Sequence, residues 1–177
     1  MGYIGLKFFE KEEARMIPKI KRILYATDLS ENSSYAFIYA VDMAKKHGAK
    51  IIILHAIEPI PPYAEAYIPL KETMQQKQEA LITTVKSRLE EFCKKAEPQI
   101  GTCVDLVEKI LVPVGHPPEE ILNAANDENC DLIVMGTHGK GFLAHTFLGS
   151  VSDAVLRRTR KPVFIIPIPS EKVTMDW

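Results

Sequence analysis

The stretch that decides the fold of this chain is LIVMGTHG at residues 132–139, followed after nine further residues by Gly149-Ser150. Its apolar first half is typical of a buried strand, and the residues from Gly149 onward are typical of a helix. A glycine at a strand end lets the backbone approach a ligand, and free N–H groups at a helix start attract anions. This placement indicates a phosphate-binding position in an α/β protein. A tight turn followed by a helix cap is the alternative reading of the same residues.

Strand-like and helix-like segments alternate on both sides of this stretch. Pro98 and Gly101 are expected to end the second helix, and 58–69, with four prolines, is expected to form a surface loop. The β-α repetition favours a doubly wound parallel sheet, in which the polar start of 103–114 indicates an edge strand. The expected strands are 22–27, 51–57, 103–114, 131–136 and 162–166, and the expected helices are 32–47, 71–95, one that begins at Pro117, and 149–159.

Composition and charge limit the classes of protein to consider. The chain has 177 residues, 46% of them hydrophobic, which suits one domain of about 100 to 200 residues with a substantial core. With 22 basic and 23 acidic residues the net charge is −1, so no broad field favours nucleic acid. No apolar stretch approaches the ~20 residues that cross a bilayer. We therefore expect a soluble protein without nucleic-acid or membrane partners.

The three cysteines, Cys93, Cys103 and Cys130, are odd in number and contain no C-x-x-C pair. This pattern argues against a disulfide framework or a zinc site and favours a reducing cytoplasm. We expect all three to be small packed residues without a function of their own.

Several segments, taken in order, resemble the universal stress protein family. They are Ile23–Asp28, Ile53–Ala56, Val114–Pro117, the glycine stretch with its G-x-x-G, nine residues, G-S spacing, and Lys161–Val163. The spacing is that of the ATP-binding members. The resemblance spans roughly residues 20–168, leaving 1–19 as an N-terminal extension and 169–177 as a C-terminal tail. It implies a five-stranded parallel sheet in the order 3-2-1-4-5 with helices on both faces, an adenine-nucleotide alpha-hydrolase-like fold.

The resemblance also implies a set of nucleotide-binding residues. The glycines and Ser150 would bind phosphate, Thr27 and Asp28 would face the nucleoside, and the backbone of Ala56 would reach adenine. Asp28 as a turn former and Ser152 as an ordinary helix residue remain open alternatives. The full set is Ala26, Thr27, Asp28, Ala56, Met135, Gly136, Gly139, Gly149, Ser150, Val151 and Ser152.

The neighbouring charged residues are weaker candidates. His138 and Lys140 lie within the glycine loop, where a cation could help neutralise phosphate. Asp153 would repel phosphate, so we expect it to face solvent. We identify no catalytic residue and no protein metal site.

The function implied by the resemblance is a cytoplasmic switch in stress response that binds ATP, with ADP and AMP as alternatives. Mg²⁺ or Mn²⁺ would bind through the nucleotide phosphates. The last strand, Val163 to Ile166, would be an uncovered apolar edge in a monomer, and the family pairs it with its copy in a homodimer. A slow ATPase and a dimeric interaction module without nucleotide are the alternatives, and a protein partner is expected but unidentified.

Overall fold

The computed structural model describes residues 18–30, 33–59, 74–137 and 148–169. Most of the expected N-terminal extension, the C-terminal tail and the proline-rich loop lie outside these residues. None of the described helices is long and apolar enough to span a membrane. The strands are β1 (Arg22–Ala26), β2 (Lys50–Leu54), β3 (Val107–Leu111), β4 (Leu132–Gly136) and β5 (Val163–Ile166), and the helices are α1 (Ser33–His47), α3 (Met74–Ile100), the 3₁₀ turn η2 (Val104–Leu106), α4 (Pro117–Asp127) and α5 (Ser150–Arg158).

The strands form one parallel sheet in the order β3-β2-β1-β4-β5, which confirms the predicted topology. β3 lies at one edge, as its polar residues indicated, and β5 at the other. β1 is central and pairs with β2 on one side and β4 on the other. The chain therefore reverses its direction of winding beside β1, where α/β folds bind ligands at the carboxyl ends of the strands.

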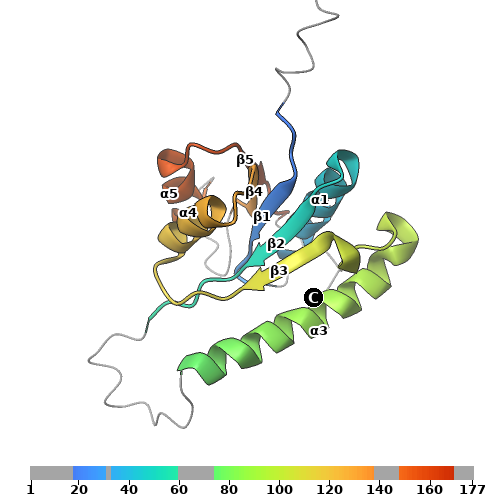
Figure 1. Cartoon of the computed structure of the whole chain (residues 1–177), viewed down its shortest axis with the longest axis horizontal. Coiled ribbons are helices and arrows are strands. Elements are labelled where there is room, and N and C mark those ends of the chain that lie inside the picture. The colour runs from blue at the N-terminus through green and yellow to red at the C-terminus, as the bar shows by residue number, and fades with distance from the viewer. Residues whose placement is uncertain (1–17, 31–32, 60–73, 138–147, 170–177) are drawn as a thin grey trace, which may run out of the picture.

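The core consists of two layers, because alternate strand residues point to opposite faces of the sheet. On one face, Tyr25 and Ile53 pack with buried residues of α1 and α3. On the other, Leu24 and Met135 pack with residues of α4 and α5. Figure 1 shows α4 and α5 together on one side of the sheet and α1 and α3 on the other. This cover on both faces explains why the central strands are continuously apolar.

The end of α3 differs from the prediction in two ways. Pro98 lies inside the helix, which continues to Ile100 before Gly101, at φ +64°, ends it. Cys93 and Cys103 form a disulfide with their Cα atoms 5.6 Å apart, so the prediction that neither cysteine is paired is wrong. The end of the helix and the turn after it bring together two cysteines that are 10 residues apart in the sequence. Cys130 is buried and unpaired, as expected.

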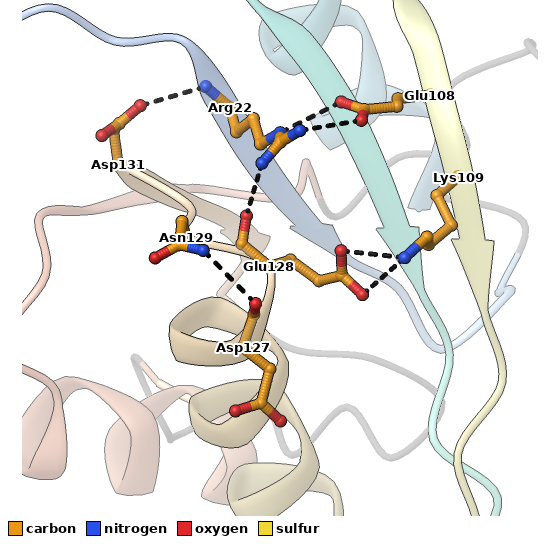
Figure 2. A network of polar contacts seen from close by, with 7 residues as sticks. All are labelled: Arg22, Glu108, Lys109, Asp127, Glu128, Asn129 and Asp131. Atoms are coloured by element: carbon orange, nitrogen blue, oxygen red, sulfur yellow. Dashed lines mark hydrogen bonds and ion pairs between the residues drawn. The ribbon is translucent and has the colours of Figure 1, made fainter.

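A polar network lies at the amino-terminal ends of the strands (Figure 2). Arg22 reaches across to Glu108 of β3, with its Nε and Nη2 atoms 3.2 and 3.0 Å from the carboxylate oxygens, and its Nη1 donates to the Glu128 carbonyl at 3.3 Å. Lys109 donates to both oxygens of the Glu128 carboxylate, and Asp131 accepts from the Arg22 backbone N–H. These contacts link β1, β3 and the residue before β4 at the ends of the strands opposite the cavity described next.

Candidate functional site

A cavity of about 490 Å³ opens at the carboxyl ends of β1, β2 and β4, beside the start of α5. This is the place where the change in winding direction predicts a ligand site. Its volume lies within the range of about 300–1,000 Å³ that is common for small-molecule sites. The wall is formed by Tyr25, Ala26, Thr27, Asp28, Ser33, Ala36, Leu54, His55, Ala56, Glu58, Pro117, Ile121, Met135, Gly136, Gly149, Ser150, Val151, Ser152 and Ile168.

Every predicted binding residue that the structure describes lies on this wall. They come from three strand ends and one helix start, which are widely separated in the sequence. Gly139, His138 and Lys140 lie outside the described residues. The fold therefore brings together four segments that the sequence presents apart, although this gathering alone does not identify a ligand.

The junction of β4 and α5 supplies backbone donors to the cavity. Gly149 is the N-cap of α5, and its N–H donates to the Thr137 carbonyl at 2.6 Å, which draws the ends of the glycine loop together. Among the described residues, no side chain caps the helix. The N–H groups of Ser150, Val151 and Ser152 lie in the first turn, where they have no intrahelical partner, and the Asp153 N–H is the first to donate within the helix, to the Gly149 carbonyl at 2.9 Å. Neither Gly136 nor Gly149 has a positive φ, so neither position depends on the unusual backbone conformation that glycine permits.

Ser152 and Asp153 extend this junction. The Ser152 hydroxyl donates to the Gly136 carbonyl at 2.8 Å, and the residue is buried. That bond links the helix start to the strand end, a structural role beyond that of an ordinary helix residue. Asp153 pairs with Arg157 at 2.9 Å on the exposed side of α5, in agreement with the expectation that it faces solvent. The hydrogen bond and charge of Asp153 raise the pKa of the Arg157 guanidinium.

The segment after β1 forms a compact turn. The Leu29 N–H donates to Thr27 Oγ1 at 3.0 Å, and the Ser30 N–H donates to Asp28 Oδ1 at 3.1 Å. Leu29 has a φ of +57°, in the left-handed region. Asp28 therefore does form a turn, and it lies on the cavity wall as well. The two roles proposed for it from the sequence are compatible.

The end of β2 exposes backbone groups. The neighbouring N–H groups of His55 and Ile57 donate to carbonyls on the β3 side, at 3.0 and 2.8 Å. Within the described part of the chain, neither the N–H nor the C=O of Ala56 has a hydrogen-bond partner. An unpaired donor and acceptor on one residue of a cavity wall can bind a ligand with matching groups.

Sequence reasoning missed several wall residues, His55 and Tyr25 among them. His55 directly follows β2 and could have been found by the rule that ligands meet strand ends. Its Nδ1 atom lies 2.9 Å from the Thr27 carbonyl oxygen. Tyr25 is fully buried, its hydroxyl donates to the Ser33 carbonyl at 2.6 Å, and burial raises its pKa far above the ordinary value. No sequence signal distinguishes Tyr25 from an ordinary core residue.

Across residues 18–30, 33–59, 74–137 and 148–169, no group of three or more His, Cys, Asp and Glu side chains is placed to hold an ion.

Comparison with protein families gives a match to the universal stress protein family over residues 19–167. A universal stress protein of Thermus aquaticus, from the 3′ region of a QAH/OAS sulfhydrylase gene, is 38% identical over 148 residues, covering 82% of this chain and 98% of the relative. Universal stress protein MJ0577 of Methanocaldococcus jannaschii is 31% identical over 157 residues, covering 82% and 94%.

Solved structures agree with this relationship. The structure of MJ0577 superposes with a TM-score of 0.65 at 30% identity, covering 87% of this chain and all of that one. A universal stress protein in complex with cAMP superposes with a TM-score of 0.54 at 27% identity, covering 84% and 98%. At least one similar protein therefore binds an adenine nucleotide.

Proposed function

The chain belongs to the universal stress protein family, and we propose that its cavity binds an adenine nucleotide, ATP above all, as the ligand of a switch in stress response. The observation that carries the proposal concerns the described residues of one cavity: the start of α5 has no side-chain cap there, and the N–H and C=O of Ala56 have no partner there. The N–H groups at the start of α5 suit a phosphate, and the N–H and C=O of Ala56 suit a base. The proposed contacts are the predicted set, with Gly139 included on the resemblance alone.

The phosphate end of the ligand would lie at the start of α5. The free N–H groups there, together with the helix dipole, favour an anion without any basic side chain. Ser150 is exposed on the cavity wall and could add a hydroxyl donor. Mg²⁺ or Mn²⁺ would then be held through the phosphate oxygens, since the described wall brings no cluster of protein ligands.

The nucleoside would lie toward β2. The N–H and C=O of Ala56 form a donor next to an acceptor, which complements the N1 acceptor and the amino donor on one edge of adenine. Thr27 and Asp28 lie between this position and β4, within reach of a ribose. Because β1 separates β2 from β4, the two ends are about 10 Å apart, two strand spacings, and this suits the length of a nucleotide.

Identification of the nucleotide that copurifies with the protein, by mass spectrometry, tests this proposal. Gly136→Val is the matched variant, because valine fills space on the cavity wall while suiting a strand end with ordinary backbone angles. We expect an adenine nucleotide in the wild type and none in the folded variant. Release of ADP from bound ATP would support the slow ATPase instead. A wild type that is empty and fails to bind added ATP with Mg²⁺ would leave the interaction module.

We also propose a homodimer formed through β5. Among the described strands, β5 pairs only with β4. Phe164 is 36% exposed, with its ring centroid 6.0 Å from that of Tyr39. Pairing of two β5 edges about a two-fold axis would cover it. Light scattering should give a dimer for the wild type and a monomer for Phe164→Glu; a wild-type monomer would contradict the proposal.

We place the protein in the cytoplasm, where an ATP pool could load the cavity. The cysteines no longer support this location, because two of them form a disulfide.

A further inference from the structure

We propose that His55 is a positioning residue of this site, whose imidazole replaces the backbone hydrogen bond that is missing where β1 and β2 part. The ring would bind the Thr27 carbonyl and so leave the Ala56 N–H available to a ligand. The expected effect on affinity rests on the proposed nucleotide function. The hydrogen bond between the His55 ring and the Thr27 carbonyl does not depend on that function.

The missing bond follows from the register of the two strands. Thr27 donates its N–H to the Leu54 carbonyl at 2.9 Å, which is the last backbone bond between this pair. In a regular parallel ladder, the Thr27 carbonyl would next accept from the N–H of Ala56. It accepts instead from the His55 ring, with 2.9 Å between Nδ1 and the oxygen. Ala56 has no hydrogen-bond partner in the described segments.

The bond determines the tautomer of the ring. A carbonyl oxygen can only accept, so Nδ1 must carry the proton. In the neutral imidazole, Nε2 is then an acceptor, and no hydrogen-bond partner for it occurs among the described residues. The ring thus has one nitrogen committed to the fold, on a residue that lines the cavity.

The turn after the Thr27 carbonyl contains two local bonds. Thr27 Oγ1 and Asp28 Oδ1 accept from N–H groups only two residues ahead. The link from the Thr27 carbonyl to His55 ties this turn to β2. Without the imidazole, the Ala56 N–H could close onto the Thr27 carbonyl, completing the ladder and withdrawing the donor that we assign to adenine.

The tautomer can be measured without any nucleotide. Long-range ¹H–¹⁵N NMR spectra of the ligand-free protein, with the His55 signals assigned by their loss in His55→Leu, should show a proton on Nδ1. Amide exchange at Ala56 should be fast in the wild type and slower in His55→Leu. A ring without a proton on Nδ1, or a protected Ala56 amide in the wild type, would overturn the proposal.

Calorimetry with ATP and Mg²⁺ tests the consequence for binding. His55→Leu should weaken binding about tenfold, the usual effect of one lost hydrogen bond, while His55→Asn, whose amide N–H can replace Nδ1–H, should stay within about threefold of the wild type. His47→Leu is the control, because this exposed histidine ends α1 away from the cavity wall. Equal affinity of His55→Leu and wild type, or failure of His55→Asn to restore binding, would refute the role in binding. If the wild type binds no ATP, the nucleotide proposal fails, and the NMR and exchange results alone decide the role of His55.

Discussion

Reduction of the Cys93–Cys103 disulfide should lower the free energy of unfolding substantially. The bond spans a sequence separation of 10 residues, for which the loop-entropy relation gives about 2.7 kcal/mol at room temperature. Cys93 is 3% exposed and Cys103 fully buried, so the reduced thiols would remain packed in the native protein. The change should therefore arise mainly in the unfolded chain, which gains freedom when the loop opens.

Urea unfolding followed by circular dichroism, with and without a phosphine reductant, measures this difference. For a slope of about 2 kcal/mol per molar urea, the midpoint should fall by between about 1 and 2 M on reduction. The double variant Cys93→Ala/Cys103→Ala is the control, and reductant should leave its midpoint unchanged. Before reduction, the denatured wild type should titrate one thiol, that of Cys130, out of three cysteines. Three reactive thiols, or a midpoint that does not move on full reduction, would refute the reasoning.

Three further predictions concern stability. Tyr25→Phe should lower the free energy of unfolding by about 1 to 2 kcal/mol in urea titrations, because it removes the buried hydrogen bond to the Ser33 carbonyl; an unchanged midpoint would contradict this. Gly48→Ala should cost about 1 kcal/mol through backbone strain at φ +63°, since a Cβ there meets no atom within 4 Å, and Gly48→Asn should recover part of the loss. Burial raises the pKa of the Cys130 thiol from 9.0 to about 11, so the native protein keeps this proton after the unfolded chain has lost it. Stability should be complete below pH 9 and fall by up to about 1.4 kcal/mol per pH unit as pH rises toward 11, a slope that Cys130→Ala should reduce.

The elements of the fold were predictable where local signals agree with burial. The β4 stretch is apolar and ends at Gly136, and α4 begins at Pro117 with acidic residues in its first turn, as dipole considerations require. The order of the strands in the sheet could not be predicted in this way, because periodicity does not determine which strands are neighbours. It came from the resemblance to a family, and the sheet confirms it.

The end of α3 and the start of β3 differ from the prediction. Pro98 was expected to stop α3, but the Gly101 N–H still donates to the Glu97 carbonyl at 2.8 Å, and Lys45 of α1 donates to the Ile100 carbonyl. These contacts and the nearby disulfide hold the last turn of the helix despite the proline. The expected strand 103–114 was too long, because its first residues form η2 and β3 spans Val107–Leu111.

The candidate site was predictable in its residues more than in its chemistry. The resemblance to a family supplied the set from Ala26 to Ser152, and its described members lie on the cavity wall. The unpaired backbone of Ala56 and the ring of His55 depend on where two strands part, which no sequence pattern records. The hydroxyl of Ser152 was expected near phosphate, but in the structure it donates to the Gly136 carbonyl.

The central claim, that the start of α5 binds the phosphates of an adenine nucleotide, is tested most directly by calorimetry of ATP with Mg²⁺ on Ser150→Asp. An aspartate in the first turn stabilises a helix by about 0.3 to 1 kcal/mol, so lost binding could not be attributed to a weakened helix. Ser87→Asp, the same change on the exposed face of α3, is the matched control. The account predicts wild-type affinity for Ser87→Asp and, because like charges repel, binding at least about tenfold weaker for Ser150→Asp. Equal affinity of the two variants, or a wild type that binds no ATP, would contradict it.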